Sequence, residues 1–553
     1  MPEQALYLDE SLGRNFRFLV LEVIKQVDGA QRALLGLDEV PTERLVSRDD
    51  YIDHLRTLVE NKCFALLRKG EGIDKPTVDF LRSTTAITTN LERIADHAVS
   101  AVRQGERLSR RDFVDRYEML PFFQAIFSSL ELVIEAYENR DSAKALQIAQ
   151  GELELDELYE ERFGRILHDL ESGQEVANHV TTLFILHYLE RIGDCLQNVG
   201  EAILFAKMGE RLKMRAYRQL SNVVHPEASE PTLDEVTFEG IWGTRSGSQI
   251  GRVAGNGLAH DEPEAIFKEG DRKKILKEKD AMERWASLVP GLAPRVLRYE
   301  DGERASMLVQ YLEGQTLQEI VMNQPLRDVD VALARVHETI RRVWTETKDA
   351  EPVQPRFLAQ LESRLGDVYA VHPYFSGGGQ QIGFLKVATL AELLERGRPL
   401  DDLLGAPFTV LGHGDFNLDN IIFNARDDSV HFIDLHRSRR MDYVQDVSVH
   451  LVSNFRVPVF RPRRRTTLNR VIEAMLDFSR GFAADHGDTT FEARLALGLV
   501  RSFITSTRFE IRRAFAEEML RRALYLLERL ESHAEAHREM SAFRLPRDVL
   551  IYG

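Results

Sequence analysis

The chain has 553 residues, more than one compact core normally holds, so two or three domains are expected. Its 88 Asp and Glu residues outnumber its 72 Lys and Arg residues, and the net charge of -16 argues against nucleic acid or an anionic membrane surface as a partner. The two cysteines, Cys63 and Cys195, are too few for a disulfide framework, and no run of about 20 apolar residues is found to span a bilayer. We therefore expect a cytoplasmic protein without a membrane span, and the sequence leaves homo-oligomer formation open.

Residues 8–215 have the apolar spacing of helices throughout. Phe16, Leu19 and Val23 show this spacing near the start, and proline is rare over the whole segment. The motif LERIAD at 91–96 returns as LERIGD at 189–194. We therefore predict two copies of a helical unit, each of about 100 residues.

Each copy of this motif places two carboxylates four residues apart, on one face of its helix. The four residues are Glu92, Asp96, Glu190 and Asp194. Asp53 and Asp156 stand in similar places upstream, 103 residues apart. Two interpretations stay open: a solvated acidic face, or carboxylates from paired helices that share metal ions.

These motifs, LERIADHA and LERIGDCL, resemble those of PhoU, a helical phosphate-signalling protein built from two three-helix repeats with E-x-x-x-D motifs. The resemblance covers residues 8–215 and implies an all-α bundle. It also implies that the four carboxylates bind iron, zinc or manganese. Phosphate-signalling or transporter proteins would then be partners of this domain.

A boundary follows, because residues 216–235 include SNVVHPEASEPTLDE, which holds two prolines among small and acidic residues. We predict a linker there. Beyond it come the strand-like runs TFEGIWG, QIGRVAG and EAIFKEG, a helix over 273–288, and a hairpin whose turn is Asp301-Gly302. Long helical patterns return from Leu317, so residues 236–549 predict a small β-rich lobe followed by a large helical lobe.

The β-rich lobe carries the residues expected to contact a nucleotide. They are Thr244, Ser246, Gly247, Ser248, Lys268, Glu278, Gln310 and Leu312. The first four lie in a turn of small residues whose N–H and hydroxyl groups suit a triphosphate, although an ordinary hairpin turn is the alternative. Lys268 suits the α- and β-phosphates and Glu278 could hold it by an ion pair, with Glu283 as the competing partner. Gln310 and Leu312 lie where the chain would pass to the large lobe and meet the adenine.

The segment VLGHGDFNLDNIIF contains His413, Asp415 and Asn420 in the spacing H-x-D-x-x-x-x-N, which kinase catalytic loops use. Phosphoryl transfer needs a carboxylate that takes the proton of the acceptor hydroxyl, and five residues later an amide oxygen for magnesium. Asp415 is the predicted base, His413 is predicted to belong to the catalytic residues with it, and Asn420 is the predicted magnesium ligand. Asp434, at the end of the strand-like run VHFID, is the predicted second ligand.

These features resemble the aminoglycoside phosphotransferase family of kinase-like enzymes, which includes antibiotic, choline, homoserine and sugar kinases. The resemblance covers residues 236–549 and implies an α+β protein-kinase-like fold with ATP and magnesium as cofactors. By that match Asp446, in DYVQDVSVHL, is a structural carboxylate. The sequence departs from many members directly after the metal aspartate, where it reads Asp434-Leu435-His436, and the acceptor therefore stays unspecified.

Two functions remain in view. The first is an ATP- and magnesium-dependent phosphotransferase that acts on a small-molecule hydroxyl and is regulated by the helical domain in response to phosphate or metal. The second is a phosphate-signalling adaptor whose kinase-like half only binds nucleotide or a partner protein. The intact set of base, lysine and metal ligands favours catalysis. The arginine run 461–465 is interpreted as a solvated loop or as a contact for an anionic substrate.

Overall fold

A computed structural model describes residues 10–37, 41–68, 73–210, 212–227, 233, 236–241, 249–255, 258, 263–377, 381–382, 384–386, 388–459, 461–537 and 539–551. The chain forms two compact units. The first contains Met1–Gly270 and Arg298–Leu308, and the second contains Asp271–Leu297 and Val309–Gly553.

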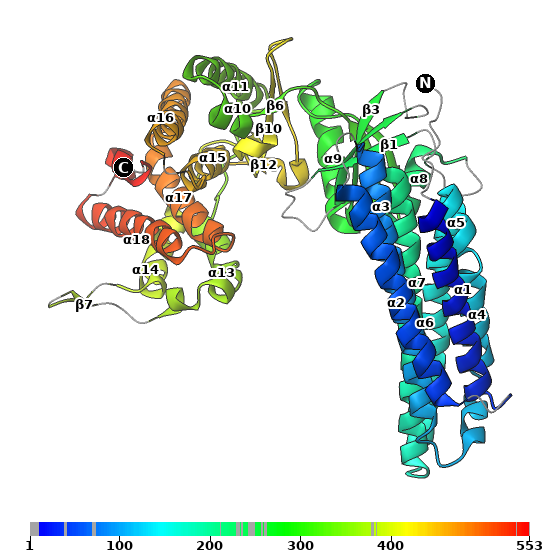
Figure 1. The fold of residues 1–553 in the computed structure, drawn as a ribbon. Coiled ribbons are helices and arrows are strands. Elements are labelled where there is room, and N and C mark those ends of the chain that lie inside the picture. The colour runs from blue at the N-terminus through cyan, green and yellow to red at the C-terminus, as the bar shows by residue number, and fades with distance from the viewer. Residues whose placement is uncertain are drawn as a thin grey trace. The chain divides into compact units, whose positions relative to one another are not determined.

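The first unit begins with a bundle of long helices (Figure 1). They are α1 (Glu10–Leu34), α2 (Thr42–Arg68), α3 (Lys75–Gly105), α4 (Leu120–Leu130), α5 (Val133–Asn139), α6 (Ser142–Leu170) and α7 (Val176–Met208). The first three form one repeat. The second repeat consists of α4 with α5, then α6 and α7, so its first helix is broken into two. The two predicted three-helix repeats are confirmed.

Apolar faces bring the two repeats together. α3 packs along α7, and these helices carry the two LERI motifs. Leu91 and Ile94 of α3 and Leu189 and Ile192 of α7 are all fully buried. Burial of such side chains stabilises a helix by about 1.5–3 kcal/mol each, which is more than helix propensity alone supplies. The E-x-x-x-D carboxylates therefore lie beside the core, with positions set by their apolar neighbours.

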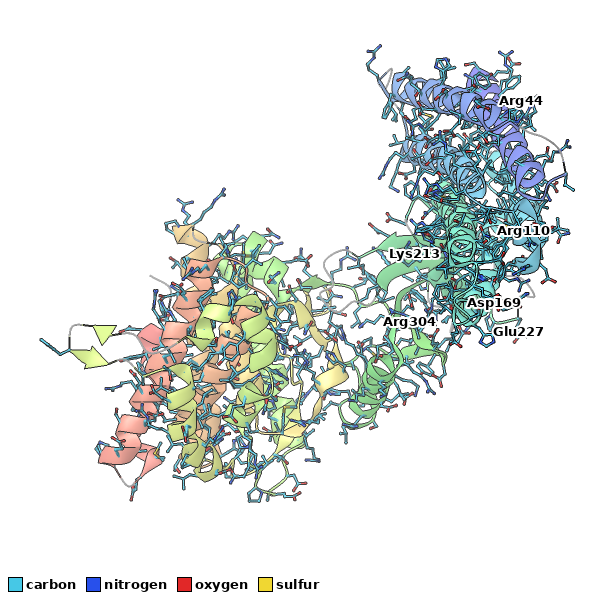
Figure 2. All side chains as sticks on the ribbon, turned by 90° about the horizontal axis from the view of Figure 1, so that it is seen from below. Arg44, Arg110, Asp169, Lys213, Glu227 and Arg304 are labelled. Atoms are coloured by element: carbon cyan, nitrogen blue, oxygen red, sulfur yellow. The ribbon has the colours of Figure 1, made fainter. Side chains whose placement is uncertain are left out.

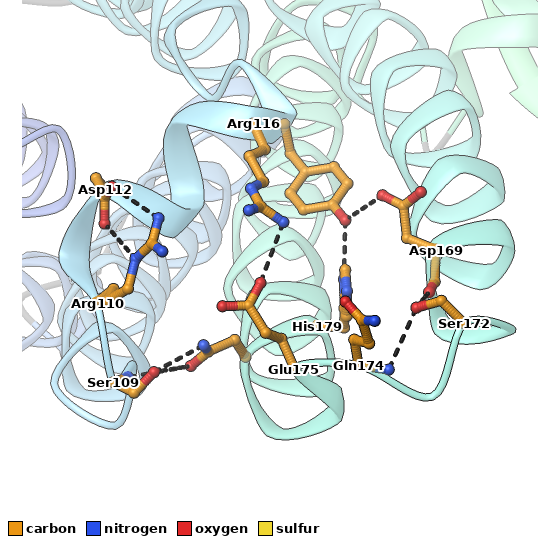
Figure 3. Close-up of polar contacts among 11 residues, drawn as sticks. Ser109, Arg110, Asp112, Arg116, Asp169, Ser172, Gln174, Glu175 and His179 are labelled. Carbon is orange, nitrogen blue, oxygen red and sulfur yellow. Dashed lines mark hydrogen bonds and ion pairs between the residues drawn. The ribbon is translucent and has the colours of Figure 1, made fainter.

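One end of the bundle is closed by a 3-10 helix, η1 (Arg111–Tyr117), which joins the repeats (Figure 3). The hydroxyl of Tyr117 donates to Asp169 Oδ2 at 2.7 Å and lies 2.9 Å from His179 Nδ1. Asp169 lies near the end of α6 and His179 in the first turn of α7. The buried tyrosine thus ties the connection to both helices of the second repeat.

Leu120–Asn139, which covers α4 and α5, passes a length and hydropathy test for a membrane span, with a mean hydropathy of 1.2. The sequence itself was expected to contain no run of this kind. Half of this segment is buried, and its buried side chains include Phe122, Phe123 and Ile126. Core helices of soluble proteins pass the same test, and α4 contacts α6, α7 and α1 of the bundle. We interpret the segment as a core element.

A five-stranded sheet follows the bundle. Its strands are β1 (Val236–Gly240), β2 (Gln249–Gly255), β3 (Glu264–Asp271), β4 (Val296–Glu300) and β5 (Arg304–Gln310), in the order β1-β2-β3-β5-β4. β1 pairs with β2, and β2 with β3, in antiparallel register. The predicted turn at Asp301-Gly302 connects the neighbouring strands β4 and β5. The β-rich segment is therefore confirmed.

The helix α8 (Met214–Val224) joins the bundle to this sheet, and it includes the first residues of the predicted linker. Arg298 of β4 donates to the carbonyl oxygens of Val223 and Val224 at 2.8 and 2.5 Å. Gln219 donates to the carbonyl oxygen of Arg304 on β5 at 3.0 Å (Arg304 is labelled in Figure 2). Residues 216–224 are thus part of a helix packed on the sheet, so only the rest of the segment is left to act as a linker.

The second unit is mainly helical. Its helices are α9 (Arg272–Leu288), α10 (Leu317–Asn323), α11 (Leu326–Glu346), α12 (Phe357–Glu362), α13 (Leu365–Val371), α14 (Leu390–Leu403), α15 (Val444–Arg456), α16 (Pro462–Asp485), α17 (Phe491–Thr507) and α18 (Arg513–Ala536). α17 is buried along almost its whole length and packs against α15 and α18. This helical core supports a small β region that carries the predicted catalytic loop.

Short strands form that region. β10 (Ile421–Asn424) pairs with β11 (Ser429–Phe432) and with β6 (Gln315–Thr316), while β9 (Val410–Gly412) pairs with β12 (Arg439–Met441). The segment 413–420 connects β9 to β10, and the segment 433–438 connects β11 to β12. The two connections contain the predicted base and the predicted metal ligands.

Candidate active site

The loop after β9 is held by Asp446 of α15. The carboxylate accepts the backbone N–H of His413 at 2.8 Å and that of Gly414 at 2.7 Å. Asp446 is fully buried, and burial raises its pKa to about 7, against the effect of the two N–H donors. Gly414 has φ 83°, and a Cβ there would lie 2.5 Å from the carbonyl oxygen of Arg437. The loop conformation therefore needs both the glycine and the buried carboxylate.

Asp415 is the next residue, and its side chain is 17% exposed. Oδ1 accepts from Asn417 Nδ2 at 2.8 Å, and Oδ2 is paired with Arg437 Nη1 at 3.2 Å. Asn420 Nδ2 donates to the main-chain oxygen of Asp415 at 2.9 Å. One amide and one guanidinium thus hold the carboxylate of the predicted base, while Asn420 holds its main chain.

His413 lies behind this loop. Its Nδ1 accepts the backbone N–H of Asp415 at 3.3 Å, and its ring is fully buried beside Phe416 and Phe432. Burial lowers the pKa of the imidazole, so the ring is neutral. The buried ring contacts the backbone of the base and is not open to solvent, and the catalytic role of His413 stays a prediction.

Asp434 follows β11 and adopts left-handed backbone angles of φ 59° and ψ 53°. Such angles are uncommon in residues other than glycine and concentrate at functional sites. Oδ1 of Asp434 lies 2.7 Å from Nδ1 of His436, and Nε2 of His436 accepts from Arg437 Nε at 3.1 Å. One tautomer, with the proton on Nδ1, satisfies both contacts. A continuous polar chain therefore runs from Asp434 through His436 and Arg437 to Asp415.

α9 is anchored to the same loop. Trp285 Nε1 donates to Ser438 Oγ at 2.7 Å, and Ser438 Oγ donates to the carbonyl oxygen of Gly412 at 2.7 Å. α9 also packs on the short helix η5 (Leu435–Arg437). The helix that bears Glu278 is thus fixed relative to the catalytic segment.

In the helical bundle the predicted carboxylates gather into two clusters. Burial, Asp96 and Glu92 raise the pKa of Asp49 to about 6. In the second repeat burial raises the pKa of Glu152, and so do Asp156, Asp194 and Glu190. Each cluster therefore holds the two predicted carboxylates together with one residue that the sequence reasoning missed. The offset of 103 residues between Asp49 and Glu152 was the signal that could have found both.

The clusters also contain arginine. Arg56 pairs with Asp53 at 2.7 Å and with Glu92 at 3.3 Å, and Arg191 pairs with Asp194 at 2.5 Å. Within the described ranges, no three His, Cys, Asp or Glu side chains are close enough together to hold a metal ion. Carboxylate oxygens are the right donors for a hard cation, but a cation would have to displace the guanidinium groups.

Two family models match this chain. The PhoU domain model matches residues 19–104 and 122–203, and the model of the phosphotransferase enzyme family matches residues 261–482. The chain joins a PhoU domain to a phosphotransferase domain. Its fold class is the predicted one, an all-α bundle followed by an α+β kinase-like fold.

Relatives of the PhoU domain are phosphate-specific transport system accessory proteins. The homologue from Clostridium acetobutylicum is 29% identical over 192 residues, which cover 34% of this chain and 88% of that protein. The homologue from Zymomonas mobilis is 29% identical over 216 residues, 37% of this chain and 89% of that protein. Among solved structures, an apo aminoglycoside phosphotransferase is 13% identical, covering 54% of this chain and 95% of its own, with a TM-score of 0.35.

The predicted nucleotide contacts of the phosphotransferase domain are only partly described. Thr244, Ser246, Gly247 and Ser248 lie outside the described residues. Lys268 lies on β3 with 9% exposed, and Gln310 ends β5, where its N–H donates to the carbonyl oxygen of Arg295 at 2.9 Å. Leu312 follows and is half-buried.

Of the two candidate partners for Lys268, Glu278 is 3% exposed. Glu283 is 54% exposed and paired with Lys279 at 2.8 Å. Burial therefore favours Glu278. Lys268 belongs to the first unit and Glu278 to the second, and the ion pair between them stays a prediction.

Metal binding by the PhoU domain is open to a direct test. If the acidic clusters hold iron, zinc or manganese, elemental analysis should find that metal in the purified protein, because carboxylates with raised pKa values gain most from a nearby cation. The content should fall when Glu92, Asp96, Glu190 and Asp194 are all changed to alanine. The matched control changes four exposed carboxylates outside the clusters, Glu10, Glu43, Asp112 and Glu131. Equal metal content in the two quadruple variants would show that these carboxylates do not hold the metal and would favour a solvated acidic face.

Proposed function

We propose that the phosphotransferase domain transfers the γ-phosphoryl group of ATP to the hydroxyl of a small-molecule acceptor. The observation that carries the proposal is the fixed orientation of Asp415, whose carboxylate is held by Asn417 and Arg437 on a loop anchored by Asp446. A carboxylate that is already oriented can accept a proton without reorganising in the transition state. The family match to phosphotransferase enzymes supports the same class of reaction.

In the proposed reaction one phosphorus–oxygen bond forms and another breaks. The acceptor oxygen forms a bond to the γ-phosphorus, the bond from that phosphorus to the bridging oxygen of ADP breaks, and the hydroxyl proton passes to Asp415. Asn420 and Asp434 offer amide and carboxylate oxygens, which suit magnesium, and both lie on the two connections that contain the base. Magnesium bound there would neutralise charge on the phosphates. Lys268, held by Glu278, would contact the α- and β-phosphates.

The proposal includes regulation of this activity by the PhoU domain in response to phosphate. Its support is the contact between α8 and the strands β4 and β5, because β5 neighbours β3, the strand of Lys268. A shift of the PhoU domain could thus reach the nucleotide-binding strand. A coupling free energy of about 1–3 kcal/mol, usual for allosteric proteins, would change the activity about 5- to 150-fold.

The test measures ATP consumption by the full-length protein against amino alcohols, sugars, aminoglycosides and hydroxy acids, with and without magnesium, and repeats it across a titration of inorganic phosphate. We expect magnesium-dependent turnover with some acceptors and a several-fold response to phosphate. The Arg298→Met variant, which loses the contacts to α8, should show a weaker response. Nucleotide binding without turnover on any acceptor would instead favour the adaptor function. A flat phosphate response would contradict the regulatory part alone.

A further inference from the structure

Four arginine side chains gather around the proposed base, and we call them the arginine cluster. They are Arg364 before α13, Arg437 on η5, Arg501 on α17 and Arg508 directly after α17. Arg437 pairs with Asp415 at 3.2 Å. Besides burial, Arg437 lowers the pKa of Arg364, Arg501 and Arg508, Arg508 lowers that of Arg364, and Arg364 lowers that of Arg501; each of the three also interacts with Asp415. All four belong to the second unit.

Most of this positive charge lacks a matching carboxylate. Arg501 is 3% exposed, its Nη2 donates to Ser448 Oγ at 3.1 Å, and its Nε has no hydrogen-bond partner among the described residues. Burial, Arg364 and Arg437 together lower the pKa of Arg501 to about 9, although Asp415 and Asp446 act in the opposite direction. Among the described residues neither carboxylate forms a hydrogen bond or ion pair with Arg501, and a buried guanidinium that is so incompletely paired is costly, because it has lost its hydration.

The other two members are also poorly paired. Arg508 Nε is buried without a hydrogen-bond partner among the described residues, and Nη1 of the same side chain forms an ion pair with Asp367 Oδ2 at 3.6 Å. Asp367 is 72% exposed, so this pair is well solvated and weak. In the described part of the chain the guanidinium of Arg364 makes no hydrogen bond or ion pair. Burial, Arg437 and Arg508 lower its pKa.

The same unit shows how an arginine with a purely structural role is satisfied. Arg494 is fully buried and paired with Asp442 at 2.8 Å and Asp488 at 2.6 Å. Arg465 is buried and donates to the carbonyl oxygens of Val459, Phe455 and Val457. The arginine cluster has no comparable set of acceptors. An anion bound beside Asp415 would neutralise this excess of positive charge and supply the missing hydrogen-bond acceptors.

We propose that the arginine cluster binds an anionic group, a carboxylate or a phosphate, on the acceptor whose hydroxyl faces Asp415. The inference rests on the proposed function and adds the substrate class. Guanidinium groups bind carboxylates and phosphates in a bidentate manner, and this geometry would orient the acceptor as well as neutralise the cluster. The acceptor is then a hydroxy acid or a phosphorylated polyol. Cationic amino alcohols and aminoglycosides would be repelled.

The experiment compares acceptors that share a hydroxyl and differ in charge: glycerate, glycerol 3-phosphate, glycerol and ethanolamine. Turnover should be found with an anionic compound, and whether glycerate or glycerol 3-phosphate is preferred separates carboxylate from phosphate. Arg508→Gln and Arg364→Gln should each raise the KM for that compound about 10-fold or more, the scale of one charge-assisted hydrogen bond. The KM for ATP should stay within about 2-fold of the native value. Arg470→Gln, which removes an exposed arginine paired with Asp330, is the matched control.

Two further readouts keep the result unambiguous. Each variant should unfold at the same temperature as the native protein or higher, because it loses an unpaired cation; a lower temperature in both variants would indicate a structural role and overturn the proposal.

Binding of glycerate and glycerol 3-phosphate is measured by calorimetry without ATP. Binding that is lost in Arg508→Gln, with no turnover on any acceptor, would support the anion site and contradict the proposed function. Turnover on ethanolamine or glycerol alone, or a rise confined to the KM for ATP, would overturn the inference and leave the proposed function in place.

Discussion

Replacing Asp415 with asparagine should lower turnover by about 10²-fold or more while the fold and the nucleotide affinity stay nearly unchanged. Asparagine has the same shape, and its amide oxygen can still accept from Asn417. It cannot take the proton of the acceptor hydroxyl. The pair with Arg437 is also weakened, but this pair is partly exposed, so its loss costs little stability.

The measurement is kcat with an acceptor found by the panel, together with nucleotide binding and a thermal unfolding curve. Asp419→Asn is the matched control, since it makes the same change on an exposed carboxylate of the same loop. That variant should keep most of its activity. Full turnover in Asp415→Asn would show that another group accepts the proton.

The sequence predicted those elements that carry a regular apolar spacing or a recognisable turn motif within their own residues. The LERI repeats marked α3 and α7, and Asp301-Gly302 marked the β4–β5 turn. α8 was missed, since the two prolines that follow it suggested a linker. Its apolar spacing, Tyr217, Leu220 and Val224, was present in the sequence. The signal was short, and the contacts with β4 and β5 that stabilise the helix are tertiary.

The candidate site was predictable only where its residues form a motif. Spacing identified Asp415, Asn420 and Asp434. The contacts of His436 and Arg437 depend on the left-handed turn at Asp434, which no pattern in the sequence reveals. The arginine cluster is harder still, because its members come from separate segments between residues 364 and 508.

The conspicuous arginine run 461–465 is instead at the start of α16. Arg465 serves there as an internal hydrogen-bond donor to backbone carbonyl groups. A search for runs of basic residues in the sequence therefore finds the start of α16 and misses the arginine cluster. Charge on neighbouring segments matters only after the helices have brought those segments together.

Arg494→Met should destabilise the second unit by about 3–5 kcal/mol, the scale for removing one partner of a buried ion pair. The guanidinium is fully buried and pairs with both Asp442 and Asp488, and burial lowers its pKa less than these two carboxylates raise it. Methionine fills much of the volume and leaves two buried carboxylates without a cation. Tyr443 still donates to Asp488 at 2.7 Å, and that single neutral donor cannot replace the pairing.

The loss should also reach the catalytic loop. Asp442 accepts the N–H of Val444 at 3.1 Å at the start of α15, and Asp446 of the same helix holds the N–H groups of His413 and Gly414. Denaturant unfolding can be followed by tryptophan fluorescence, because the ring of Trp344 lies 5.2 Å from that of Tyr443 and reports on this core. Arg470→Met, which breaks an exposed pair with Asp330, is the control and should cost less than about 1 kcal/mol. If both variants unfold at the same denaturant concentration as the native protein, the buried pairs contribute nothing to the second unit, and the anchoring of Asp446 must depend on the apolar contacts of α15 with α17 alone.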